Sequence, residues 1–176
     1  RTKQEIYFEG DYSDAELEAT RRLYAAEVRF VDEQVGRLLD ELTAMGRDGD
    51  TIVVVVSDHG ESLGEHDYWF EHGRHVYEAT CRVPLVVRLP DDFEDRPTPG
   101  VRHGDVSLVD LVPTLQELLS WPSEPMHAPL SARGRSFVPL LLTDSEARGP
   151  VFSEKVDREE LQRAVQAKAV RLGDWK

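Results

Sequence analysis

The stretch Thr51-Ile52-Val53-Val54-Val55-Val56-Ser57-Asp58-His59-Gly60-Glu61 determines how the rest of the sequence is interpreted. Its first part is a run of β-branched residues without polar alternation, which predicts a strand covered on both faces. Such strands are typical of the parallel sheets of α/β proteins. Its second part is a polar turn directly after the strand, where open α/β sheets bind their ligands. We therefore expect an α/β fold with a ligand site in this turn.

The turn contains side chains that suit a divalent cation. Asp58 offers carboxylate oxygens, and His59 offers a ring nitrogen. We expect Gly60 to let the chain bend sharply, so that the neighbouring side chains point at one ion. A hydrogen-bonded turn without a ligand is the alternative for a bare Asp-His-Gly sequence. A Ser-His-Asp triad is a third, disfavoured interpretation, because consecutive residues at a strand end do not converge into a proton relay.

Helical and strand patterns lie on both sides of this stretch. Ser13-Asp14-Ala15-Glu16 has the pattern of a capping box at a helix start. Apolar residues three and four apart then continue to Gly46, which predicts one buried helical stripe that ends there. Residues 106–119 are predicted to be helical, with Pro113 either in the first turn or at a kink. Further strands are predicted at residues 83–89, 151–153 and 164–171.

Composition restricts the class of protein and of partner. The 176 residues include 34 acidic and 21 basic side chains, a net charge of −13, so nucleic acid is not an expected partner. The longest strongly apolar run, residues 52–56, is far shorter than the ~20 residues that span a bilayer. One cysteine excludes a disulfide framework within the chain. Only four basic residues are lysines, which either a salt-rich cytosol or a high-GC genome would produce.

Several further segments follow the Asp-His-Gly-Glu turn in a fixed order. They are Tyr77-Glu78, Arg82-Val83-Pro84-Leu85-Val86-Val87-Arg88, Val109-Asp110-Leu111-Val112-Pro113-Thr114-Leu115, Gly134-Arg135-Ser136-Phe137-Val138-Pro139-Leu140-Leu141, and Ala169-Val170-Arg171 with Asp174-Trp175-Lys176. Together with the turn, these motifs resemble those of the sulfatase family, which belongs to the alkaline-phosphatase-like superfamily. The resemblance runs in order from about Tyr24 to the end of the chain.

The resemblance implies a fold and a set of site residues. The expected fold is a mostly parallel sheet between helices, formed by residues 1–150, with the first strands of a small C-terminal antiparallel subdomain in residues 151–176. Asp58 and His59 match the family's ligand pair for one divalent metal ion, commonly calcium and in some branches manganese. His72 matches the place where the family has a Lys or His against the sulfate and the leaving oxygen. A solvated loop histidine is the alternative for His72. The remaining histidines are expected to be structural or exposed: His66, His75, His103 and His127.

The chain departs from the family in its nucleophile. The family's motif is Cys/Ser-x-Pro-x-Arg, and Cys81 fails this spacing because Pro84 lies three residues further on. We expect Cys81 to be a small packing residue at the start of a strand. The family's N-terminal acidic metal ligands also have no counterpart among residues 1–57. We therefore expect a fragment of a longer, metal-dependent hydrolase of sulfate monoesters, and an isolated chain without turnover.

Alternative functions stay open from the sequence. A phosphonate or phosphate ester hydrolase, or a phosphoethanolamine transferase, of the same superfamily would share the Asp-His-Gly-Glu turn. A non-catalytic remnant that binds a metal or a partner is a third interpretation. For the first interpretation the expected partner is a small-molecule or glycan sulfate ester. A cytoplasmic location is expected, unless a signal peptide precedes Arg1.

Overall fold

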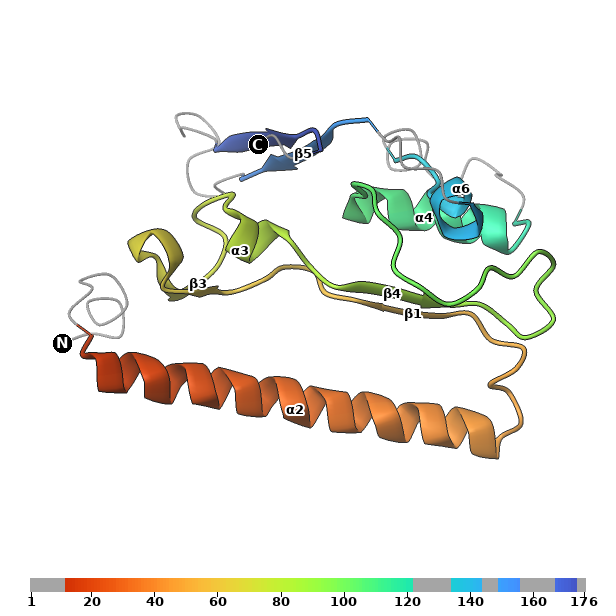
Figure 1. The fold of residues 1–176 in the computed structure, drawn as a ribbon, viewed down its shortest axis with the longest axis horizontal. Coiled ribbons are helices and arrows are strands. Elements are labelled where there is room, and N and C mark those ends of the chain that lie inside the picture. The colour runs from red at the N-terminus through yellow and green to blue at the C-terminus, as the bar shows by residue number, and fades with distance from the viewer. Residues whose placement is uncertain (1–11, 122–133, 144–148, 156–166, 174–176) are drawn as a thin grey trace. The chain divides into compact units, whose positions relative to one another are not determined.

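The computed structural model describes residues 12–121, 134–143, 149–155 and 167–173 of the chain (Figure 1). Contacts between residues divide the chain into two compact units, Arg1–Phe93 and Glu94–Lys176. Among the described residues, no helix has both the length and the apolar character that crossing a membrane requires.

The first unit begins with the long helix α2 (Asp14–Ala44). The hydroxyl oxygen of Ser13 accepts a hydrogen bond from the backbone N–H of Glu16 (3.4 Å), and the Glu16 carboxylate accepts one from the backbone N–H of Ser13 (2.9 Å). These bonds confirm the predicted capping box. The hydrogen bond from the Ser13 hydroxyl, followed by the one from its N–H, lowers the pKa of the Glu16 carboxyl. The helix is followed by Gly46, whose φ of +68° ends it as expected.

The apolar stripe of α2 is exposed, so the prediction that it is buried is wrong. No residue of α2 is buried, and the side chains of Val28, Val31 and Leu38 are 53%, 56% and 69% exposed. The 3.6-residue period identifies the face that a second layer can cover, but the layer itself must come from other residues. The described part of the chain does not bury this face.

The two predicted central strands pair with each other. β1 (Val53–Val56) runs antiparallel to β4 (Leu85–Arg88), side by side in Figure 1. The pairs within the described residues are all antiparallel, so the expected parallel pairing is not found among them. Val55 and Val56 are 37% and 36% exposed, which contradicts the expected cover on both faces of this strand. A β-branched run predicts a strand. Which strand pairs with it, and in which direction, depends on residues far away in the sequence.

Between β1 and β4 the chain forms a folded loop. Its elements are β2 (Ser62–Leu63), the 3-10 turn η1 (Glu65–Asp67), β3 (Trp69–Glu71) and the short helix α3 (Glu78–Cys81). β2 and β3 pair antiparallel. The loop has its own small core, in which Ser62 is fully buried and Tyr68 is 7% exposed.

The remaining helices and strands of the described residues lie in the second unit. They are the 3-10 turn η2 (Leu108–Asp110), α4 (Leu111–Leu118), α6 (Val138–Leu142), β5 (Val151–Glu154) and β6 (Lys168–Arg171). Pro113 lies in the first turn of α4, which is the first of the two predicted alternatives. β5 and β6 pair antiparallel, as expected for the C-terminal strands. Residues 164–166 of the predicted last strand lie outside the described residues, and the proposed boundary at residue 150 stays a prediction.

Asp110 connects the two sequence motifs of the second unit. Its carboxylate accepts hydrogen bonds from the backbone N–H groups of Arg135 (2.7 Å) and Ser107 (2.9 Å). Thr114 donates its hydroxyl to the carbonyl oxygen of Asp110 (2.6 Å) and accepts from the backbone N–H of Phe137 (2.9 Å). Asp110 and Thr114 are both buried, and every one of these bonds satisfies a polar group removed from water. The motif Asp-x-x-Pro-Thr is therefore structural here.

Candidate metal and catalytic site

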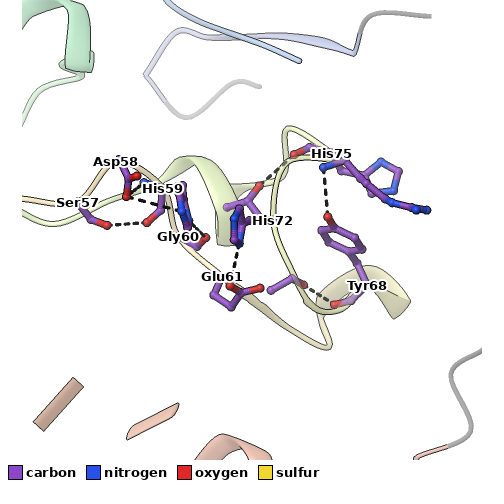
Figure 2. A network of polar contacts seen from close by, with 11 residues as sticks. Ser57, Asp58, His59, Gly60, Glu61, Tyr68, His72 and His75 are labelled. Carbon is purple, nitrogen blue, oxygen red and sulfur yellow. Dashed lines mark hydrogen bonds and ion pairs between the residues drawn. The ribbon is translucent and has the colours of Figure 1, made fainter. Parts of the chain in front are cut away.

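The candidate site begins at the residue that follows β1. Ser57 donates its hydroxyl to the carbonyl oxygen of His59 (2.7 Å), and Oδ1 of Asp58 accepts from the backbone N–H of His59 (3.0 Å). These two bonds close a tight turn directly after the strand (Figure 2). The Asp58 side chain is 86% exposed and the His59 side chain 43% exposed. Both predicted ligands are therefore accessible to an ion.

A backbone carbonyl determines which nitrogen of His59 is available. Nδ1 of His59 lies 2.9 Å from the carbonyl oxygen of Gly60. Since a carbonyl oxygen only accepts, Nδ1 carries the hydrogen in this contact. In a neutral ring Nε2 then keeps its lone pair. Metal-binding histidines are commonly oriented by such a second hydrogen bond.

The spacing of the two candidate ligand atoms fits one divalent cation. Oδ1 of Asp58 and Nε2 of His59 lie 3.7 Å apart. Two ligand atoms at 2.0–2.6 Å from a shared ion lie about 3–4 Å from each other. In the described residues, however, no group of three or more His, Cys, Asp and Glu side chains could hold a metal ion. The turn therefore offers two candidate ligands, which alone would not complete the coordination shell of an ion.

Gly60 was predicted to let the chain bend sharply, but the structure shows a close backbone contact at this residue instead. It is not among the residues with positive φ. Its backbone N–H instead donates to the carbonyl oxygen of Thr80 (2.9 Å), and a Cβ at position 60 would lie 2.1 Å from the carbonyl oxygen of Ala79. The glycine thus permits close approach between the turn after β1 and the backbone of α3.

His72 lies directly against the candidate ligand pair. The ring of His72 stacks on the ring of His59, with centroids 3.7 Å apart and 18° between the planes. Its side chain is 47% exposed. Thirteen positions separate the two histidines in the sequence, and β2, η1 and β3 bring them together (Figure 2). The three residues singled out from the sequence therefore share one site.

Glu61 is a member of this site that the sequence did not assign. Its Oε2 lies 3.0 Å from Nδ1 of His72, and its side chain is 21% exposed. The only signal for it in the sequence is its position at the end of the Asp-His-Gly-Glu turn. That position places it beside the ligand pair, but its contact with His72 depends on how the intervening loop folds.

Ser62 and Glu65 hold the start of the loop that carries His72. Oε2 of Glu65 accepts from the backbone N–H of Leu63 (2.7 Å) and from the Ser62 hydroxyl (3.2 Å). Burial raises the pKa of the Glu65 carboxyl. The hydrogen bonds from the N–H groups of Glu65 and Leu63 and from Ser62, together with the charge of Arg21, outweigh burial, so that the pKa is lowered overall. The ionised carboxylate is therefore the form that holds the loop.

Tyr68 and Arg74 hold the other end of the same loop. The Tyr68 hydroxyl accepts from the backbone N–H of Arg74 (3.2 Å). Burial raises the pKa of Tyr68. Glu71, next to His72, pairs with the Arg74 guanidinium at 3.5 Å. These contacts restrict the conformations of residues 68–74, the segment that carries His72.

The remaining candidates lie outside this site. His66 and His75 both stack on Tyr77, with centroids 4.2 Å and 5.0 Å away, in agreement with a structural role in the loop. His103 is exposed, and His127 lies outside the described residues. Cys81 is the last residue of α3, not the first of a strand as predicted, because β4 begins only at Leu85.

Comparison with known proteins gives one clear family. The family model described as Sulfatase matches residues 2–120. The choline-sulfatase of Rhizobium meliloti (strain 1021) is 32% identical over 166 residues, which are 94% of this chain and 30% of the relative. The N-acetylglucosamine-6-O-sulfatase of Bacteroides thetaiotaomicron is 35% identical over 130 residues, which are 73% of this chain and 21% of the relative. The chain thus spans less than a third of the length of these curated relatives.

Solved structures agree with these matches and add a second chemistry. BT4656, solved in complex with its substrate D-glucosamine-2-N,6-O-disulfate, aligns with a TM-score of 0.72 and 26% identity over 98% of this chain and 35% of its own. The phosphonate monoester hydrolase SpPMH from Silicibacter pomeroyi aligns with a TM-score of 0.70 and 29% identity over 87% of this chain and 28% of its own. Both likenesses support the α/β fold class predicted from the sequence.

Proposed function

The chain belongs to the sulfatase family, and we propose that it supplies two metal ligands and the leaving-group acid of a longer hydrolase of sulfate monoesters. In this proposal Asp58 and His59 are ligands of one divalent metal ion, calcium or manganese, and His72 acts on the leaving oxygen. The nucleophile and the other ligands come from protein that this chain does not contain.

The observation that carries the proposal is the contact between His59 and His72. Both rings are accessible. Because the rings stack, His72 lies close to any ion that His59 would bind. A divalent ion at such a site polarises the oxygens of a sulfate ester when it is bound. Asp58 and His59 would hold that ion at the end of β1, with the Nδ1 bond to Gly60 fixing the His59 ring.

His72 would handle the proton in the proposed reaction. A sulfate monoester that loses its alcohol develops negative charge on the departing oxygen, which a protonated imidazole can neutralise by donating from Nε2. Nδ1 of His72 is already engaged by the Glu61 carboxylate at 3.0 Å. The ring edge that carries Nε2 is therefore the edge available to a substrate.

Hydrolysis of a phosphonate or phosphate monoester is the second candidate function. The structural likeness to a phosphonate monoester hydrolase favours it specifically, because identity with that protein is 29% at a TM-score of 0.70. Both ester classes have a tetrahedral centre with anionic oxygens, so the same ligand pair and the same acid would serve either. The two curated relatives described above, matched over 166 and 130 residues, both have sulfatase names, which is why the sulfate ester is placed first.

The test uses the complete protein in which the chain lies, with Asp58→Ala as the variant. Aryl sulfate and aryl phosphonate esters are offered to both forms with calcium or manganese, and bound metal is measured by elemental analysis. We expect Asp58→Ala to lose most turnover and most bound metal. Asp67→Asn is the matched control, since Asp67 is an exposed acid of the same loop with a φ of +55° that asparagine tolerates.

Each result of this test has a distinct meaning. Turnover of the sulfate ester supports the first function, and turnover of the phosphonate ester alone supports the second. Full metal occupancy in Asp58→Ala would contradict the ligand assignment. Residues 1–176 on their own are expected to turn over neither ester with either metal, and sulfatase activity of the isolated chain would contradict the proposal that the nucleophile lies elsewhere.

A further inference from the structure

We propose that Glu61 is a positioning residue, which holds the ring of His72 in one orientation for the reaction. The inference rests on the proposed function of His72. Oε2 of Glu61 lies 3.0 Å from Nδ1 of His72, and the Glu61 side chain is only 21% exposed. The bond is therefore largely shielded from water, which would otherwise compete for both partners.

The contact fixes which nitrogen of His72 is free. An ionised carboxylate only accepts hydrogen bonds, so Nδ1 of His72 is the donor and Nε2 is left for other partners. The stack on His59, with 18° between the ring planes, restrains the plane of the same ring. One contact at the edge and one at the face together restrain the rotation of His72 about both side-chain torsions.

Glu61 itself is held from both sides. The preceding residue, Gly60, donates its backbone N–H to the carbonyl oxygen of Thr80 (2.9 Å), and the following residue, Ser62, is fully buried. A side chain on backbone that is fixed in this way can orient a partner accurately. His72, in contrast, lies after β3 on a loop that is mostly exposed.

The second carboxylate oxygen of Glu61 also points to a constrained side chain. Oε1 is buried, and no hydrogen-bond partner is found for it among the described residues. A buried acceptor without a partner has lost its hydrogen bonds to water without replacing them, which is destabilising. Such a cost in a side chain that contacts a candidate site residue indicates a functional constraint.

Glu71 provides a matched comparison within the same loop. It is the neighbour of His72 in the sequence, and its Oε2 is also buried without a partner among the described residues. Its Oε1, however, pairs with the Arg74 guanidinium at 3.5 Å. Two half-buried glutamates thus lie close to His72: Glu71 is its neighbour in the sequence, and Glu61 is the one whose carboxylate contacts the ring.

The first experiment observes the ring itself in the 176-residue chain. Two-bond ¹H–¹⁵N correlation spectra of the histidine rings are recorded at about pH 9, above the ordinary histidine pKa, so that neutral tautomers are compared. We expect hydrogen on Nδ1 of His72 in the unmodified chain, and a mixture of tautomers in Glu61→Ala. Glu61→Gln retains an acceptor oxygen and should retain Nδ1–H, and Glu71→Gln should leave the His72 signals unchanged. His72 signals that do not respond to Glu61→Ala would overturn the proposal.

The second experiment is a double-mutant cycle in the complete protein. We expect Glu61→Ala to lower kcat about tenfold to a hundredfold for esters with poor leaving groups, with less effect on KM. In a His72→Ala background the same change should have little further effect, since a positioning residue acts through the ring it holds. Multiplicative losses would overturn the proposal. An unchanged rate in His72→Ala would instead contradict the proposed function of His72, and the ring spectra distinguish this failure because they do not depend on turnover.

Discussion

The α-carbon of Gly60 and the carbonyl oxygen of Ala79 are packed so closely that a Cβ on residue 60 would lie 2.1 Å from that oxygen. The contact joins the turn after β1 to the short helix α3, and a hydrogen bond from the Gly60 N–H to Thr80 accompanies it (2.9 Å). Asp58, His59 and Glu61 flank this glycine. The contact at this glycine therefore determines the backbone position of the turn that carries the three candidate site residues.

Gly60→Ala is expected to destabilise the chain and to displace the turn. Overpacking of this kind costs about 1–3 kcal/mol, and here the obstructing atom is backbone, which cannot rotate away. Urea unfolding measures the change. The matched control is Gly36→Ala in α2, where nothing lies within 4 Å of the new Cβ. That change should stabilise the exposed helix by about 0.5–1 kcal/mol, and equal effects of the two substitutions would contradict the packing role of Gly60.

A second prediction concerns acid and the loop that carries His72. The pKa of Glu65 is lowered in the fold, because the N–H groups of Glu65 and Leu63, the Ser62 hydroxyl and the charge of Arg21 together outweigh the effect of burial. The stability that Glu65 contributes is therefore present above its unfolded pKa and is lost as the pH falls through its lower folded pKa. Because Glu65 is exposed, solvent screening reduces this contribution, so Glu65→Gln should cost less than about 1 kcal/mol near neutral pH and less still near pH 3.

Unfolding in urea at the two pH values checks this difference. Glu27→Gln, at an exposed position of α2, serves as the control and should change stability by less than about 0.5 kcal/mol. A loss in Glu65→Gln that is as large near pH 3 as at neutral pH would show that the charge of the carboxylate is not what holds Leu63 and Ser62.

The sequence predicted those parts of the fold that depend on near neighbours. The capping box of Ser13 and Glu16 and the end of the helix at Gly46 are local, and both were predicted correctly. The burial of the helix stripe and the partner of β1 depend on residues far away in the sequence. Periodicity and β-branched composition contain no information on either: the stripe is exposed, and β1 pairs antiparallel with β4 within the described residues.

For the candidate site, too, the sequence predicted what depends on near neighbours and missed what depends on the fold of the loop. Asp58 and His59 are consecutive, so their common position after a strand follows from the sequence. The contacts of His72 with His59 and Glu61 require the chain to turn through β2, η1 and β3, with positive φ at His66 and Phe70. Positive φ at residues other than glycine has no reliable signal in a sequence. The resemblance to a family placed His72 in the site, whereas spacing alone would not have done so.

A third prediction concerns salt. The net charge of −13 and the scarcity of lysine predict self-repulsion if the surface is an adaptation to a salt-rich cytosol. Thermal unfolding of the chain is compared at about 0.1 M and about 2 M KCl, where the Debye length falls from about 10 Å to under 3 Å. A markedly higher midpoint at high salt supports adaptation. Equal midpoints in KCl would favour a high-GC genome as the source of the composition.

The last prediction separates the proposed acid from a solvated loop histidine. In the complete protein, His72→Ala should slow aryl sulfates with poor leaving groups by about 10²–10⁴-fold, the range that a general acid contributes. Good leaving groups depart without a proton, so their rates should fall much less, and the dependence of log kcat/KM on leaving-group pKa should steepen. His75→Ala is the control, because His75 is an exposed histidine of the same loop that stacks on Tyr77. It should leave that dependence unchanged. A loss in His72→Ala that is the same for every leaving group would mean that the ring binds substrate or supports His59, and the acid role would then be wrong.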